Sequence, residues 1–124
     1  MSAQTILLIE DDSYQISMYG TRLKNLGYTV INAKTMKKAL QLAKETQPDL
    51  ILLDMLLGED NGYKILKKLK SDSTTKNLKV VILSNYKEHK FITDCLQQGA
   101  LDYLVKSELS NQEFTQKVRH YLKD

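Results

Sequence analysis

Cysteine, proline and long apolar runs are scarce in this chain of 124 residues, and two of these shortages exclude whole classes of protein. The single cysteine, Cys95, rules out an internal disulfide and fits a reducing compartment. No stretch approaches the roughly 20 apolar residues that a membrane span needs, and the N-terminus has no signal-peptide pattern. We therefore expect a cytoplasmic protein that does not associate with a membrane.

Positive charge is also not concentrated in any one place. The formal net charge is +3, and the lysines are spread over expected helices instead of forming a run with interleaved aromatic residues. We therefore expect no direct binding to nucleic acid. His89 and His120 fall on helix faces that we expect to be exposed, so neither is given a catalytic role.

What the chain does contain is a regular alternation of apolar segments and helical patterns. Strands are expected near 5–10, 28–33, 49–54, 78–83 and 101–105, and the segments between them repeat apolar residues at helical spacing. The last helix should begin with a capping box formed by Ser110 and Glu113. Strict alternation predicts one α/β domain over residues 1–124: a doubly wound, five-stranded parallel sheet between two layers of helices.

Two of the apolar runs end in acidic residues. Ile6-Leu7-Leu8-Ile9 stops at Glu10-Asp11-Asp12, and Leu50-Ile51-Leu52-Leu53 stops at Asp54. The carboxyl ends of parallel strands meet at one edge of a sheet, which is where ligands bind. Several carboxylates at that edge would suit a hard divalent cation such as Mg²⁺.

Two further strand ends supply a hydroxyl group and an ammonium group, Ser84 and Lys106. A carboxylate can capture a phosphoryl group as an aspartyl phosphate. Because an anion then attacks an anion, a metal ion must neutralise the phosphoryl oxygens. Lys106 and Ser84 would contact the remaining oxygens, so this set of residues indicates phosphoryl capture by a carboxylate.

These residues resemble the receiver domains of bacterial two-component response regulators over essentially the whole chain. The resemblance rests on motifs in order along the chain: Leu-Ile-Glu-Asp-Asp at the first strand end, Asp-Leu-Ile-Leu-Leu-Asp-Met at the third, Gly62 eight residues after Asp54, Leu-Ser at the fourth, Gly99-Ala100, and Asp102-Tyr103-Leu104-Val105-Lys106. It implies a flavodoxin-like (βα)5 fold and a single receiver domain.

Carried over residue by residue, the resemblance makes Asp54 the phospho-accepting aspartate. Glu10 and Asp11 become the acidic pair, with Asp11 a direct Mg²⁺ ligand beside Asp54 and the backbone carbonyl of Leu56 another ligand. Asp12 is a third acid that could shift this pair by one position, or it could cap the following helix.

The family's hydroxyl and lysine then correspond to Ser84 and Lys106. Tyr103 is either a packed tyrosine at the edge of the core or the aromatic residue that changes rotamer when the hydroxyl side chain moves towards phosphate. Leu56 and Tyr86 should flank the path of attacking water, which predicts a long-lived phosphorylated form.

The resemblance also implies partners and an output surface. A histidine kinase or phosphotransfer protein would donate the phosphoryl group, and the response would appear on the face of the fourth helix, fifth strand and fifth helix. That face could contact a downstream protein target or pair two copies as a homodimer. The chain is either a stand-alone receiver or one domain of a larger regulator with a fused effector domain. It would be a signalling switch that catalyses only its own phosphorylation and dephosphorylation.

Three positions depart from the family pattern. Gly58 stands where a proline is usual, and Ser107 follows Lys106 in place of a cis-proline. We expect a trans bond between Lys106 and Ser107, because a cis bond without proline costs about 2.5–4 kcal/mol. Asn85 is bulkier than the small residue usual beside the hydroxyl and could crowd the pocket.

Two other functions compete with the receiver hypothesis. The first is a degenerate receiver that binds partners without phosphorylation. The absence of the two usual prolines gives this hypothesis some weight. The second is a metal-dependent phosphatase or a small cofactor-binding protein. A phosphatase would need a further acid two residues after its nucleophile, where this chain has Leu56. The dinucleotide-binding glycine motif is absent after the first strand.

Overall fold

The structure is a computed structural model that describes residues 3–58 and 60–123. In this part of the chain, strands and helices follow one another as β1 (Thr5–Ile9), α1 (Ser13–Asn25), β2 (Thr29–Ala33), α2 (Met36–Thr46), β3 (Leu50–Leu53), β4 (Leu56–Leu57), β5 (Asp60–Asn61), α3 (Gly62–Ser71), β6 (Val80–Ser84), α4 (His89–Gln97), β7 (Asp102–Val105), the 3₁₀-helix η1 (Lys106–Glu108) and α5 (Asn111–Leu122). None of these helices combines the length and the apolar character that a bilayer span requires.

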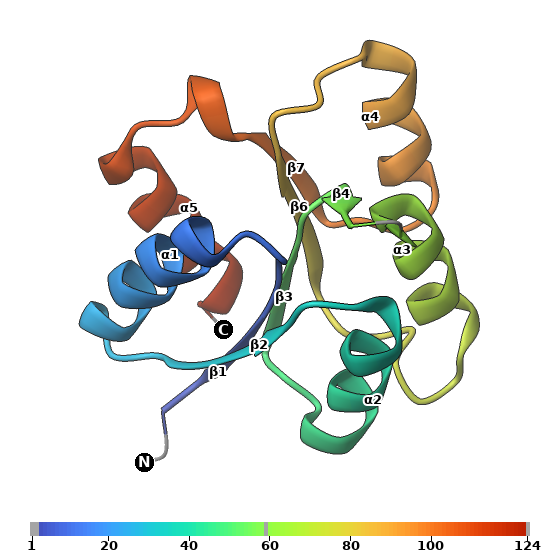
Figure 1. Ribbon diagram of the computed structural model, residues 1–124, viewed down its shortest axis with the longest axis horizontal. Helices are drawn as coiled ribbons and strands as arrows, with labels where there is room; N and C mark the ends of the chain where they lie inside the picture. Colours follow the sequence, from blue (N-terminus) through green and yellow to red (C-terminus); the bar gives the residue numbers. More distant parts are fainter. Residues whose placement is uncertain (1–2, 59, 124) are drawn as a thin grey trace.

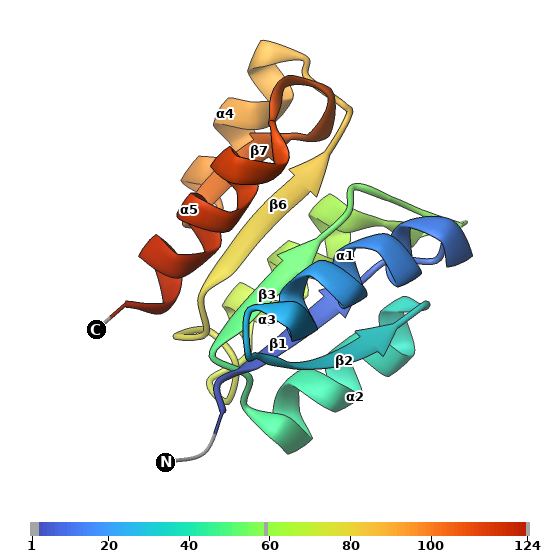
Figure 2. The same ribbon diagram turned by 90° about the vertical axis from the view of Figure 1, so that its left-hand side faces the viewer.

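The predicted parallel sheet is confirmed. Its strands pair in parallel in the order β2-β1-β3-β6-β7. Helices α1 and α5 cover one face of the sheet, and α2, α3 and α4 cover the other (Figures 1 and 2). The chain moves outward from β1 in one direction to β2 and in the other to β3, so the carboxyl ends of β1 and β3 lie side by side at a topological switch point.

Apolar side chains fill the space on both sides of the sheet. Alternate residues along β1 divide between the two layers: Leu7 and Ile9 pack under α2, α3 and α4, whereas Ile6 and Leu8 pack under α1 and α5. Burial on both faces explains why β1, β3 and β6 are continuous apolar runs. Cys95 is fully buried in the first of these layers, as the helical spacing around it indicates.

A small β-hairpin between β3 and α3 was not expected from the sequence. Strands β4 and β5 pair antiparallel, with Leu56 opposite Asn61, and Gly58 between them has a φ of 55°. Proline is restricted to a φ near −65°, so it could not take the conformation of Gly58. A proline in place of Gly58 would therefore require a different conformation of this loop.

Side chains at the helix starts account for several expected boundaries. Asp12 caps α1 by accepting a hydrogen bond from the Gln15 amide at 2.9 Å. The predicted capping box at the start of α5 is confirmed, with Ser110 and Glu113 each accepting from the other's backbone amide. Since Asp12 satisfies the helix terminus, Glu10 and Asp11 are left as the acids that directly follow β1.

Candidate functional site

The ends of β1, β3, β6 and β7 open onto one shallow pocket of about 250 Å³. The predicted site residues that line it are Glu10, Asp11, Asp54, Leu56, Ser84 and Lys106. Four residues outside the predicted catalytic and metal set line it as well: Asp12, Gln15, Asn85 and Tyr86. The structure thus brings together side chains that lie up to 96 positions apart in the sequence.

Lys106 lies at the centre of this pocket with its ammonium group almost fully enclosed. Its side chain is 8% exposed, and Nζ donates to Glu10 Oε1 at 2.9 Å and to Asp54 Oδ2 at 3.5 Å. A third bond goes to Oε1 of Gln15 on the first turn of α1. Burial of a charge is tolerated when it is paired, and here the pairing places the ammonium beside both acids.

Glu10 is the most deeply buried acid of the pocket. Its Oε2 accepts from the backbone amides of Asp11 and Asp12 at 3.1 and 3.3 Å, while Oε1 faces Lys106. Burial raises the pKa of the Glu10 carboxyl above its usual value of 4.5, and the nearby charge of Asp54 raises it further. The bond from Lys106 opposes these effects without cancelling them.

Asp54 directly follows β3 and projects into the pocket. Its backbone amide donates to the carbonyl of Ile9, and its Oδ1 accepts from the amide of Leu56 at 3.4 Å. Gly62, at the start of α3, comes so close that an added Cβ would lie 2.5 Å from the carbonyl oxygen of Asp54. Glycine at this position therefore lets α3 begin directly against the backbone that holds Asp54.

The side chains of Asp11 and Asp54, together with the adjacent hairpin, could hold a metal ion. Asp11 is exposed, and its Oδ2 lies 3.4 Å from where a Cβ of residue 58 would stand. No three acidic, histidine or cysteine side chains form a ready-made metal cage within residues 3–58 and 60–123. Mg²⁺ commonly binds through one or two carboxylates together with water and phosphate oxygens, so the donor set present here fits that ion.

Ser84, which lines the pocket, and Tyr103 lie on the adjacent strands β6 and β7. Ser84 is buried, and its Oγ accepts from the Tyr86 amide at 3.2 Å. Tyr103 does not line the pocket; its ring is buried and its hydroxyl donates to the Tyr86 carbonyl. Burial raises the pKa of Tyr103 to about 12, although the neighbouring Ser84 hydroxyl lowers it slightly. Both side chains are thus connected to the same loop after β6.

The loop after β7 is tied to the loop after β6 by Asn85. Its Oδ1 accepts from the backbone amide of Ser107 at 2.8 Å, a bond that a proline at 107 could not donate. No cis peptide bond occurs among the described residues, so the bond between Lys106 and Ser107 is trans, as expected. Asn85 lines the pocket, as we expected. It also joins the loops after β6 and β7 through its hydrogen bond with Ser107.

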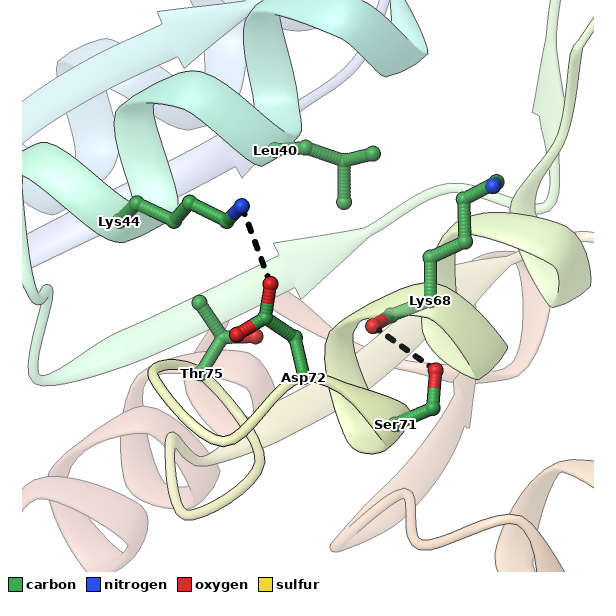
Figure 3. Close-up of a pocket in the computed structure, with 6 residues that line it drawn as sticks. All are labelled: Leu40, Lys44, Lys68, Ser71, Asp72 and Thr75. Carbon is green, nitrogen blue, oxygen red and sulfur yellow. Dashed lines mark hydrogen bonds and ion pairs between the residues drawn. The ribbon is translucent and has the colours of Figure 1, made fainter.

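A larger pocket of about 460 Å³ lies between α2 and α3 and includes none of the predicted site residues. Figure 3 shows Lys44 and Asp72 pointing towards each other across it, and their ion pair measures 3.0 Å. Ser71 donates to the carbonyl of Lys68 instead of facing a ligand. The polar groups that line this larger pocket are largely paired within the protein. Its size alone therefore does not make it the functional site.

Known proteins resemble this chain over nearly its full length. Residues 6–119 match the family model of the response regulator receiver domain. The chain is 26% identical over 121 residues to the polar-differentiation response regulator DivK of Brucella ovis, covering 98% of each protein.

Solved structures show the same similarity in three dimensions. A putative response regulator from Chloroflexus aurantiacus superposes with a TM-score of 0.89 at 28% identity, covering 99% of this chain and 100% of that one. The receiver domain of the sensor histidine kinase PA1611 from Pseudomonas aeruginosa, with a magnesium ion coordinated in its active-site cleft, superposes with a TM-score of 0.87 at 24% identity and the same coverage. By its sequence match, its fold and the position of its pocket, this chain belongs to the response regulator receiver domain family of two-component signalling.

Proposed function

We propose that Asp54 is the phospho-accepting residue of this receiver domain. The observation that carries the proposal is that the Asp54 carboxylate shares one pocket with Glu10, Asp11, Ser84 and Lys106. An isolated strand-end aspartate would need no buried lysine beside it. The ammonium of Lys106 lies 3.5 Å from Asp54 Oδ2, where it can neutralise charge that arrives with a phosphoryl group.

In the proposed reaction, a carboxylate oxygen of Asp54 attacks the phosphorus atom of a phosphodonor. A bond forms between that oxygen and phosphorus, while the bond from phosphorus to the donor's leaving group breaks. The leaving group is imidazole for a phosphohistidine protein and acetate for acetyl phosphate. Lys106 and Ser84 would bind oxygens of the transferred group, and the chain acts as a switch that promotes only its own phosphorylation and dephosphorylation.

The proposed metal ligands are Asp11, Asp54 and the backbone carbonyl of Leu56, with Glu10 as the second acid of the pair. Mg²⁺ bound there would neutralise the phosphoryl oxygens during attack. The carboxylate and carbonyl oxygens are hard donors of the kind that this ion prefers. The magnesium ion described in the cleft of the PA1611 receiver domain is consistent with this proposal.

The proposed switch runs from Ser84 through Tyr103 to the face formed by α4, β7 and α5. Ser84 and Tyr103 both hydrogen-bond to the backbone of Tyr86. A shift of Ser84 towards a phosphoryl group would therefore disturb the bond that holds the Tyr103 hydroxyl. We propose that the chain is cytoplasmic and that a histidine kinase or phosphotransfer protein is the donor. The face of α4, β7 and α5 would then contact a downstream target, a fused effector domain or a second copy of this chain.

The test is to incubate the protein with Mg²⁺ and acetyl phosphate and to measure its intact mass. We expect the gain of one phosphoryl group, located at Asp54 by peptide analysis and absent when Mg²⁺ is chelated. Asp54→Asn should abolish the gain. Asp72→Asn, which removes an acid from the pocket between α2 and α3, should leave it unchanged. No gain in folded parent protein would favour the phosphorylation-independent module.

A further inference from the structure

Lys106 depends on acceptors from three different elements. An ammonium group carries three donors, and at 8% side-chain exposure it has little access to water. Its acceptors are Glu10 after β1, Asp54 after β3 and Gln15 on α1. Two of these are charged acids of the phosphorylation site, and the third is a neutral amide that no motif marks.

The three acceptors would respond differently to a bound cation. The site proposed above assigns both carboxylates to the region of Mg²⁺ and phosphoryl binding, so a cation competes for their charge. Gln15 carries no charge and is not among the proposed ligands. Its backbone is also fixed, because its amide donates to the N-cap Asp12 at 2.9 Å. Gln15 is therefore the acceptor best placed to keep its bond to Lys106 when the carboxylates of Glu10 and Asp54 interact with a cation.

We propose that Gln15 is a positioning residue that holds the Lys106 ammonium in the pocket while Mg²⁺ occupies the acids. Gln15 acts through Lys106 and makes no contact with the phosphoryl group. Since an ammonium can only donate, the contact requires the amide oxygen of Gln15 to face Lys106. The inference rests on the proposed function of Asp54 and goes beyond it by naming what fixes the lysine.

The first test measures the accessibility of Lys106 and does not depend on phosphorylation. Gln15→Met removes the acceptor while keeping an unbranched side chain of similar length and helix propensity. The proteins are acetylated briefly with an amine-reactive ester, with and without Mg²⁺, and lysine modification is quantified by mass spectrometry. The exposed Lys37 and Lys38 serve as internal references.

In the parent, we expect Lys106 to react slowly under both conditions. In Gln15→Met, Lys106 should react several-fold faster, and the increase should be larger with Mg²⁺ than without it. Gln41→Met is the matched control, because Gln41 is exposed on α2 and its side-chain amide donates to Glu45 on the same helix. Equal Lys106 modification of parent and Gln15→Met in Mg²⁺ would overturn the inference even if Asp54 is phosphorylated.

The second test separates positioning from direct action. The initial rate of Asp54 phosphorylation at saturating Mg²⁺ should fall about tenfold in Gln15→Met, the size expected for losing one hydrogen bond to a charged group. In a Lys106→Met background, Gln15→Met should cause no further loss. A further loss there would overturn a role through Lys106. A parent that accepts no phosphoryl group would refute the proposed function, whereas the accessibility test would still decide the lysine contact.

Discussion

At the residue scale, the pocket keeps charged groups buried by pairing them with one another. Glu10 uses one carboxylate oxygen for two backbone amides and the other for Lys106. These bonds reduce the cost of burial, but the pKa of Glu10 remains raised, so its charge is still disfavoured in the folded protein. An ionised acid at this position therefore lowers the stability of the folded protein at neutral pH.

We predict that Glu10→Gln raises the melting temperature by a few degrees at pH 7 in metal-free buffer. The folded protein holds a proton on Glu10 more readily than the unfolded chain does, since the folded pKa lies above 4.5. Stability from this group is thus present below pH 4.5 and is lost as the pH rises through the raised folded pKa. The advantage of the variant should grow between pH 4 and pH 7 in thermal denaturation. An advantage independent of pH would contradict this account.

A second prediction at this scale concerns the lifetime of the phosphorylated form. Leu56 and Tyr86 both line the pocket, at 71% and 41% exposure, where they can cover the approach of water to Asp54. Leu56→Asn and Tyr86→Ala should each release phosphate several-fold faster than the parent, measured as loss of phosphoprotein after removal of the donor. Leu101→Asn, which changes an exposed leucine outside the pocket, is the control. Unchanged lifetimes in both pocket variants would refute shielding.

At the element scale, the segment from β3 to α3 departs most from a regular β-α connection. The β4–β5 hairpin turns at Gly58, and α3 then begins at Gly62 against the backbone of Asp54 and Met55. The acceptor side chain is therefore held between a strand end and a helix start. Any change that moves α3 away from β3 should also move the pocket wall.

We predict that Gly62→Ala destabilises the fold by about 1–3 kcal/mol, because an added Cβ would lie 2.7 Å from the Met55 Cα as well as close to the Asp54 carbonyl. Both neighbours are backbone atoms that cannot rotate away. The matched control is Gly20→Ala in α1, where nothing lies within 4 Å of the added Cβ. That change should stabilise the protein by about 0.5–1 kcal/mol. Urea denaturation measures both; equal effects would contradict the argument.

At the scale of the whole molecule, the parallel sheet was predictable because buried strands and amphipathic helices are recorded locally in apolar patterns. The expected strand at 28–33 is β2 at Thr29–Ala33, and the one at 78–83 is β6, which begins two residues later at Val80. The meeting of Glu10, Asp54 and Lys106 followed from this topology, since strand ends share an edge.

The remaining features depend on contacts between distant residues. The hairpin strands β4 and β5 have two residues each, too short for any periodicity to appear. The bond from Lys106 to Gln15 spans 91 positions, and that from Ser107 to Asn85 spans 22. Neither Gln15 nor Asn85 belongs to a motif at these sites, so nothing in the sequence indicates either contact. Metal ligation and the switch role of Tyr103 stay predictions.

Cys95 offers a test of the packing of the whole molecule. It is fully buried between α4 and the sheet, with Sγ 3.9 Å from the Met55 sulfur, and burial raises its pKa to about 11. Relative to the usual value of 9.0, its thiolate fraction at pH 8 falls about a hundredfold. Alkylation should therefore be slow in native buffer and fast in urea. Equal rates in the two conditions would show that α4 does not pack as described.

The inward position of Tyr103 has a consequence for how signalling would begin. Its ring is buried and its hydroxyl donates to the Tyr86 carbonyl. If Tyr103 is the switch proposed above, its buried, hydrogen-bonded rotamer is one member of a conformational ensemble and a rotamer outside the core is another. Phosphorylation would then enrich a pre-existing member of an ensemble instead of creating a new shape. Such a receiver has a basal affinity for its target before any signal arrives, and the strength of its response is set by how often the ring leaves the core.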